Sequence, residues 1–109
     1  MPGYDFHPEA EIDLLLIWED LADDNAAAAD RVLAEIHSAL ETLVAYPRIG
    51  HRRSDLTSRP LRFIRVRNYL IAYTPDETPL WVIAVLHGRR SPRVLAAILR
   101  GREEPPPRS

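Results

Sequence analysis

The chain has 109 residues, which suits one domain with a single compact core. It contains no Cys, which excludes disulfides and thiolate metal sites and favours a cytoplasmic protein stabilised by packing. Residues 1–46 hold one Arg against eleven acidic residues, a formal charge of −10, whereas residues 47–102 hold twelve Arg against three acidic residues, a charge of +9. The total of −2 therefore conceals two oppositely charged segments, and this asymmetry points to a charged partner.

Two helices are expected near the N-terminus, after a short extended segment at residues 4–6. Pro8 suits the first position of a helix, which should run to about Ala22. A broad apolar face is expected where both a sheet and a second helix cover this helix, and it contains Ile12, Leu14, Leu15, Leu16, Ile17, Trp18 and Leu21. Apolar residues at the spacing i, i+3, i+4 and i+7 then predict a second helix over residues 26–45. The two helices should form a hairpin.

The middle of the chain is predicted to contain a loop and three strands. Pro47 and Gly50 end the second helix, and the polar stretch 51–60 has the composition of a loop. Apolar and branched residues predict strands at 61–67, 69–74 and 80–86. The last of these is continuously apolar, as a strand covered on both faces would be. Short connections between the strands favour antiparallel pairing.

The C-terminal part should contain one more helix and a tail. Ser91 and Pro92 provide a cap and a first turn, and the apolar stripe that follows ends at Gly101. Three consecutive prolines predict a disordered tail over residues 103–109, which leaves residues 1–102 as a single domain. The predicted fold class is α+β, in which an N-terminal strand and an antiparallel helical hairpin pack on a twisted, mainly antiparallel sheet with a short C-terminal helix.

Four local motifs, taken in order, resemble the RelE/ParE superfamily of type II toxin–antitoxin toxins, and the ParE branch most. They are Ala10-x-x-Asp13-Leu14-x-x-Ile17-Trp18, Ala28-Ala29-x-Arg31, Tyr46-Pro47-x-Ile49-Gly50, and Tyr69-Leu70-Ile71-Ala72-Tyr73 followed by Val85-Leu86-His87-Gly88-Arg89-Arg90. The resemblance covers most of residues 4–100. It implies a growth-inhibiting toxin that a cognate antitoxin neutralises by wrapping it, in a complex that can be of higher order.

The resemblance implies two alternative targets. ParE-like toxins poison DNA gyrase, whereas RelE-like toxins cut messenger RNA on the ribosome. The chain has no Lys among its fourteen basic residues, so the RelE version of the site, which uses lysines and arginines, cannot be assembled here. We therefore expect a gyrase inhibitor that is not an enzyme, with ribosome-dependent RNA cleavage as the alternative and a non-toxic interaction module of the same fold as a third.

Some RNase relatives use an acid, an Arg and a His, and this chain has candidates for such a set. His87 would titrate near neutral pH, with Arg65 and Tyr69 predicted on the neighbouring hairpin. The acid would have to be Glu41 or Asp55. The sequence Val-Leu-His-Gly also occurs in ParE-like toxins without RNase activity, so a structural role for His87 is the preferred interpretation.

Arginines near the predicted hairpin and after the last strand are candidates for a partner-binding surface, and they are Arg59, Arg62, Arg65, Arg67, Arg89, Arg90 and Arg93. Strand spacing places Arg65 and Arg67 on one face of the sheet and Arg62 on the other. The same residues also fit solvated charges, or charges paired with the acidic helices of the same molecule. Guanidinium groups suit carboxylates and phosphates equally, so charge alone does not choose the partner.

Several other classes of site are not expected. The four His residues lack the spacing of metal ligands, and no Gly-rich phosphate loop occurs, so we expect no metal and no cofactor. The strongly apolar run at residues 14–18 is too short to span a bilayer, so a membrane is not expected as a partner. Trp18 and Trp81 fall on predicted core elements and are expected to pack rather than to stack on bases.

Overall fold

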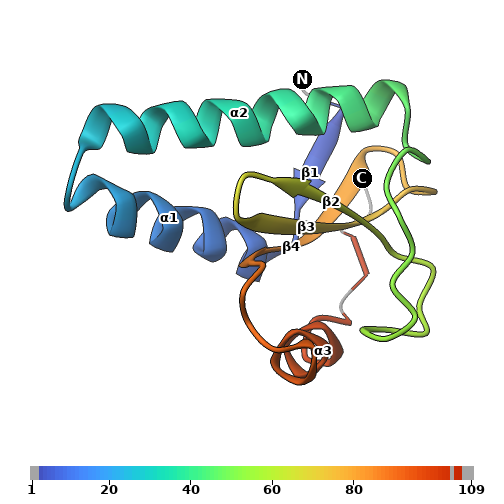
Figure 1. Ribbon diagram of the computed structural model, residues 1–109. Coiled ribbons are helices and arrows are strands. Elements are labelled where there is room, and N and C mark those ends of the chain that lie inside the picture. The colour runs from blue at the N-terminus through green and yellow to red at the C-terminus, as the bar shows by residue number, and fades with distance from the viewer. Residues whose placement is uncertain (1–2, 104, 107–109) are drawn as a thin grey trace.

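The computed structural model describes residues 3–103 and 105–106, so part of the tail predicted at 103–109 lies outside the described residues. The chain forms three helices and a mixed, open four-stranded sheet (Figure 1). The elements are β1 (Tyr4–Phe6), α1 (Pro8–Ala22), α2 (Ala26–Ala45), β2 (Arg62–Val66), β3 (Tyr69–Thr74), β4 (Leu80–His87) and α3 (Pro92–Arg100). The predicted α+β fold is confirmed.

The helices begin where side chains satisfy their first free N–H groups. His7 Nδ1 accepts a hydrogen bond from the Glu9 N–H at the start of α1, and Pro8 occupies the first turn. Asn25 accepts from the Ala28 N–H and starts α2, and Ser91 accepts from the Val94 N–H and starts α3. Because these caps are local in sequence, the predicted helix starts agree with the structure.

The sheet has the strand order β1-β4-β3-β2. β2, β3 and β4 form an antiparallel meander, as predicted, and β1 pairs parallel to β4 with Tyr4 opposite Leu80. The register between β3 and β4 shifts after Ala72, which faces Ala84, because Tyr73 then faces Val82. The extra residue on β4 is a β-bulge. It lies just beyond the point where β1 ends, and this location matters for the buried ion pair described below.

Each face of the sheet has its own core. The α1–α2 hairpin covers one face, where Ile36, Leu40 and Leu43 pack with residues that include Ile71, Val82 and Val85. On the other face, α3 and the 51–61 connection cover Phe63, Trp81, Ile83 and Leu86 with Leu56, Leu95 and Leu99. Figure 1 shows α3 on the side of the sheet away from α2. β4 therefore runs between two apolar layers, which explains its continuous hydrophobic sequence.

The prediction that sheet and helix together cover the broad apolar face of α1 is wrong for one row of that face. Leu14, Ile17 and Leu21 pack against the hairpin-side core. Ile12, Leu15 and Leu16 remain 48%, 55% and 57% exposed. The helix has only one packed side, because α2 and β4 contact it and no other element of the described chain covers this row. An acidic helix thus exposes three large aliphatic side chains.

The loop after α2 is attached to the sheet through Tyr73. The hydroxyl of Tyr73 donates to the Pro47 carbonyl at 2.7 Å and accepts from the Gly50 N–H at 3.0 Å. A Cβ added at Gly50 would lie only 2.4 Å from this hydroxyl oxygen, so glycine is required for the close approach. These contacts hold the chain against the sheet just before the loop predicted at 51–60.

Candidate functional site

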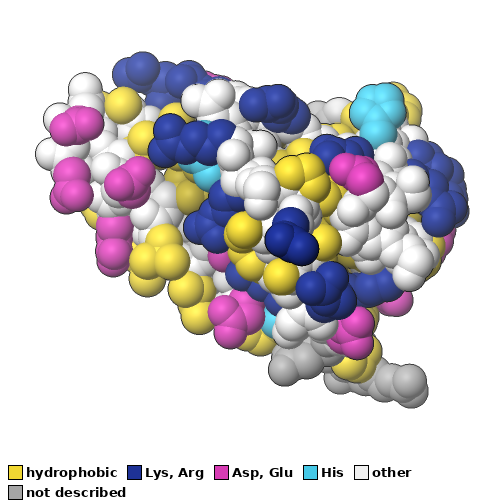
Figure 2. Space-filling model, turned by 60° about the horizontal axis from the view of Figure 1, so that its bottom comes forward, with side chains coloured by type: hydrophobic (Ala, Val, Ile, Leu, Met, Phe, Trp, Pro, Cys, Tyr) yellow, Lys and Arg dark blue, Asp and Glu magenta, His cyan; other side chains and the backbone are white. Residues whose placement is uncertain are grey.

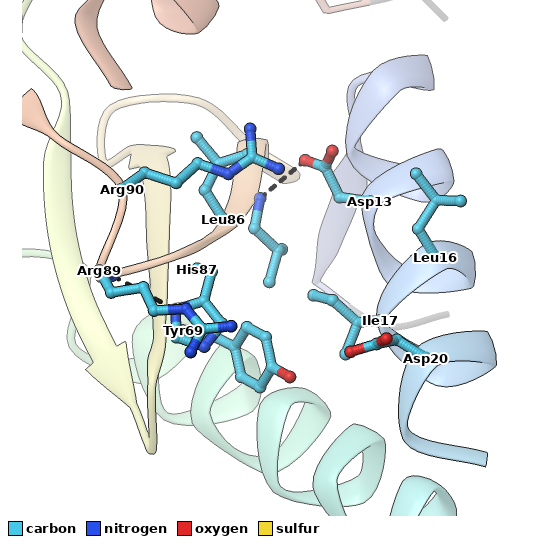
Figure 3. Close-up of a pocket in the computed structure, with 10 residues that line it drawn as sticks. Asp13, Leu16, Ile17, Asp20, Tyr69, Leu86, His87, Arg89 and Arg90 are labelled. Carbon is cyan, nitrogen blue, oxygen red and sulfur yellow. Dashed lines mark hydrogen bonds between the residues drawn. The ribbon is translucent and has the colours of Figure 1, made fainter. Parts of the chain in front are cut away.

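A depression of about 310 Å³ lies between α1 and the end of β4. One wall is formed by Asp13, Leu16, Ile17 and Asp20 of α1, and the other by Tyr69, Val85, Leu86, His87, Arg89 and Arg90 (Figure 3). Acidic and apolar groups of the hairpin thus face basic groups from the turn after β4. The structure brings four of the predicted site residues into this one depression, namely Tyr69, His87, Arg89 and Arg90.

His87 organises the turn that carries the two arginines. Its Nδ1 atom accepts a hydrogen bond from the Arg89 N–H at 3.3 Å, and its carbonyl oxygen accepts from the Arg90 N–H at 3.2 Å. The Gly88 N–H donates to the Asn68 carbonyl at 2.7 Å and ties the turn to the β2–β3 hairpin. His87 therefore positions Arg89 and Arg90 through both its side chain and its backbone.

The electrostatic surroundings of His87 favour its neutral form. Burial lowers its pKa, and the charges of Arg89, Arg90 and Arg65 lower it further, while Asp20 acts in the opposite direction. Because Nδ1 accepts the Arg89 N–H, the proton of the neutral ring must lie on Nε2. In this arrangement the free Nε2 atom is a hydrogen-bond donor, so it is poorly suited to accept a proton from a substrate.

Tyr69 lies directly opposite His87 in the β3–β4 ladder, and their rings meet edge to face with centroids 5.4 Å apart. The Tyr69 side chain is buried, and burial together with the charge of Asp20 raises its pKa. The phenol is therefore protonated over the physiological range and acts only as a hydrogen-bonding and packing group.

Arg65, the third member of the predicted RNase set, does not line the depression. Its Nε donates to the Arg67 carbonyl at 3.1 Å, and its guanidinium carbon lies 3.7 Å from the Cβ position of Gly88. Arg65 thus lies against Gly88 outside the lining of the depression, although its charge still helps to lower the pKa of His87. The two acids considered for this set are also elsewhere, because Glu41 belongs to α2 and Asp55 pairs with Arg53 at 2.8 Å in the 51–61 connection.

Four of the seven arginines predicted to bind a partner donate hydrogen bonds within the protein, and Arg65, which donates to the Arg67 carbonyl, is one of them. Arg59 donates to the Leu99 carbonyl at 3.1 Å, near the end of α3, and Arg62 donates to the Gly50 carbonyl at 2.8 Å. Arg67 forms a two-bond pair with Glu35 of α2 at 2.8 and 2.6 Å.

The prediction that Arg65 and Arg67 share a face of the sheet is wrong. β2 ends at Val66, and Arg67 lies in the turn with a φ of 53°. Its side chain is consequently turned toward Glu35 in the α1–α2 hairpin, whereas the Arg65 side chain lies beside Gly88. The period-two rule applies only while the backbone remains extended.

Arg89, Arg90 and Arg93 are exposed, and their guanidinium groups have no ion-pair partner within residues 3–103 and 105–106. They therefore differ from Arg59, Arg62, Arg65 and Arg67, which are held by carbonyl or carboxylate oxygens. These outward-facing arginines remain the strongest candidates for a binding surface.

Asp13, which lines the depression, forms a buried ion pair with Arg102. This pair was not predicted from the sequence. Arg102 donates to both carboxylate oxygens of Asp13, at 2.5 and 2.9 Å, and the two side chains are only 11% and 10% exposed. The Val85 N–H donates to the same carboxylate at 2.9 Å, and Arg102 also donates to the Ile83 carbonyl at 3.1 Å. The pair thus satisfies backbone groups of β4 at the bulge, past the end of β1.

One signal of this pair was present in the sequence. Asp13 stands within the apolar face of the first helix, one turn from Ala10 and Ile17, where an isolated charge needs a partner. The partner itself gave no such signal, because Arg102 follows the last helix and lies 89 residues away along the chain.

The described residues contain no group of three or more His, Cys, Asp and Glu side chains suited to hold a metal ion. Within the same residues, none of the helices combines the length and the apolar character that crossing a membrane requires.

Comparison with known proteins identifies one family. The sequence model of the ParE toxin of the type II toxin-antitoxin system, parDE, matches residues 4–92. This range contains β1 to β4, the hairpin and the turn after β4, and it ends at the first residue of α3. Among curated proteins, none matches the chain.

Proposed function

Because the chain belongs to the ParE toxin family of type II toxin–antitoxin systems, we propose that it stops bacterial growth by poisoning DNA gyrase and that a cognate antitoxin neutralises it. The family match over residues 4–92 is the observation that carries this proposal. Membership in the family also implies an antitoxin partner.

The surroundings of His87 support the gyrase proposal over ribosome-dependent RNA cleavage. RNA cleavage through the 2′-hydroxyl needs a group that removes a proton and a group that protonates the leaving oxygen. His87 is neutral with its Nδ1 atom committed to the Arg89 N–H, and Tyr69 has a raised pKa. Asp20 is the one carboxylate of the depression outside the buried pair with Arg102, and it has no hydrogen bond to His87 among the described residues. The chain also has no Lys, so the lysine-containing version of the RNase site cannot be assembled.

The exposed row of α1 is the proposed contact for the antitoxin. Ile12, Leu15 and Leu16 form an aliphatic row on a helix that has five acidic residues and no basic ones. Such a surface fits a partner segment that carries apolar and basic side chains, because apolar burial supplies affinity and the charges supply orientation. Leu16 also borders the depression, so a segment bound along this row would reach Arg89 and Arg90.

The test is induction of the chain in growing bacteria, followed by pulse labelling of DNA and protein synthesis in the same culture. Early failure of DNA synthesis is expected, together with inhibition of supercoiling when the purified chain is added to gyrase. Early failure of translation, with messenger RNA cut on the ribosome, would contradict the proposal and support the RNase alternative. Unimpaired growth would favour a non-toxic interaction module.

Two variants sharpen this test. Arg65→Glu/Arg90→Glu reverses two positive charges, one lining the depression and one against Gly88 of the adjoining turn, and should reduce toxicity, whereas an inert module would show no toxicity before or after the change. Ile12→Glu/Leu15→Glu, at two residues of the row that do not line the depression, should leave toxicity in place but prevent rescue by the antitoxin, which we expect to be encoded by the neighbouring reading frame. Rescue that is unchanged in this variant would move the antitoxin contact away from α1.

A further inference from the structure

The segment from His87 to Arg102 contains five arginines and no acidic residue. Asp13 neutralises Arg102, which leaves four uncompensated positive charges on Arg89, Arg90, Arg93 and Arg100. All four side chains are exposed, and none has an ion-pair partner within the part of the chain that the structure describes. We call this set the α3 face.

Helix geometry places the arginines of α3 on its outer side. Arg93 and Arg100 are seven residues apart, which brings them to the same side of the helix, about 10 Å apart along its axis. Leu95 and Leu99 lie on the inner side and are buried in the core against the sheet. Ala97, one turn after Arg93, is exposed on the same side of the helix and is small, which leaves room for a close approach, and Val94 is exposed beside it. Figure 2 shows this side of the molecule with arginine side chains around small apolar groups.

The rest of the protein directs a polyanion toward this face. α1 contains five acidic residues and no basic one, and α2 contains three acidic residues and one Arg. Both helices cover the opposite face of the sheet from α3, so the sheet separates the acidic layer from Arg93 and Arg100, whereas Arg89 and Arg90 also border the depression beside α1 (Figure 1). A polyanion is repelled by one side and attracted by the other, although the net charge of the chain is −2.

From these observations we infer that the α3 face binds the phosphate backbone of duplex DNA without reading its sequence. Arginines on an outward helix surface can neutralise phosphates of a duplex and release their counterions. The segment 88–103 has no aromatic residue on which unpaired bases could stack, which disfavours single-stranded nucleic acid. α3 also has no Asn, Gln, Asp or Glu, so apart from Arg it lacks the side chains that read base edges.

This binding deepens the proposed function, on which its biological meaning rests. Gyrase holds DNA, so a toxin that contacts both the enzyme and the duplex would bind the complex more tightly than either component. Binding of DNA by the isolated chain does not depend on gyrase being the target, and the two ideas can be tested separately.

The experiment measures fluorescence anisotropy of a labelled duplex of about 25 base pairs with the purified full chain. Four phosphate contacts give a salt slope of at most about 3.6, so affinity should fall by about 10²-fold between 50 and 200 mM NaCl. Arg93→Glu/Arg100→Glu should weaken binding by at least about tenfold at 50 mM. Arg93→Gln/Arg100→Gln, a milder pair for use if the first does not fold, should lower the slope by about 2.

The matched control is Arg31→Glu/Arg52→Glu, which changes the net charge equally at exposed positions on α2 and the 51–61 connection. It should retain the affinity of the unchanged chain. Equal losses in the two charge-reversal pairs would overturn the inference, because net charge alone would explain them. Absence of duplex binding at 50 mM, or tighter binding of a polyglutamate peptide, would also overturn it, and the latter would assign the face to an acidic protein.

A supercoiling assay with gyrase separates this inference from the proposed function. Duplex binding without gyrase inhibition would contradict the proposed target but leave the DNA surface in place. Gyrase inhibition without duplex binding would remove the DNA surface and leave the target.

Discussion

Arg100 and Arg102 are two residues apart in the chain, yet the structure uses them in opposite ways. Arg102 turns inward, where a carboxylate and a β4 carbonyl accept its hydrogen bonds. Arg100 is exposed on α3 and has no ion-pair partner in the described part of the chain. The difference has two causes. Beyond the end of β1, the edge of β4 has no neighbouring strand, so its backbone groups need other hydrogen-bond partners. Asp13 also brings a buried negative charge there, and this charge needs a cation. The same residue type is therefore structural at one position and available for binding at the other.

The largest expected effect comes from removing the inward arginine. Arg102→Ala leaves the Asp13 carboxylate buried without its cation, and we expect a loss of about 3–5 kcal/mol in the free energy of unfolding. Denaturant unfolding followed by circular dichroism measures this loss. The double variant Asp13→Leu/Arg102→Met removes both charges and should recover part of it. A single variant as stable as the unchanged chain would show that solvent reaches Asp13.

A much smaller effect is expected for an exposed pair of the same kind. Arg67→Ala removes the two hydrogen bonds to Glu35, but both side chains are about half exposed, so the Tm should hardly change. The pKa of Glu35 reports the contact directly, because Arg67 lowers it through hydrogen bonding and charge. A carboxyl titration by NMR should therefore show this pKa rising in the variant. An unchanged pKa would mean that the pair does not persist in solution.

The smallest effect is confined to acidic pH and tests how His87 holds the arginine turn. Its pKa in the folded protein is lowered, first by burial and then by Arg89, Arg90 and Arg65, so unfolding promotes proton uptake. The stability that neutral His87 contributes is complete above its unfolded pKa of about 6.5 and is lost as pH falls below that value. The Tm measured by thermal unfolding should therefore fall more steeply between pH 7.5 and 5 for the unchanged chain than for His87→Asn.

His51→Asn is the matched control for this pH series, because His51 is an exposed residue outside the depression. It should follow the unchanged chain. The same slope in all three proteins would mean that protonation does not disturb the hydrogen bond between His87 and Arg89.

Much of the fold could be predicted because its signals are local. The stripe of Val32, Ile36, Leu40 and Leu43 repeats with helical spacing, and the caps at Asn25 and Ser91 precede the helices they start. The site was only partly predictable. Tyr69 and His87 were predicted on neighbouring strands because a short connection joins β3 and β4, but they face each other only because the bulge shifts the register by one residue. The position of Arg67 was mispredicted, because its positive φ reverses the expected side.

Local patterns in the chain were enough to predict the elements, their order, the family resemblance and the separation of acidic from basic segments, because each of these depends on residues that are near neighbours. Which charged side chains are buried depends instead on contacts between distant segments. Asp13 and Arg102 meet across 89 residues, and Ile12, Leu15 and Leu16 stay exposed because nothing in the described fold packs on that row. Periodicity specifies which side chains share a face of a helix, but contacts between distant segments decide whether that face is covered.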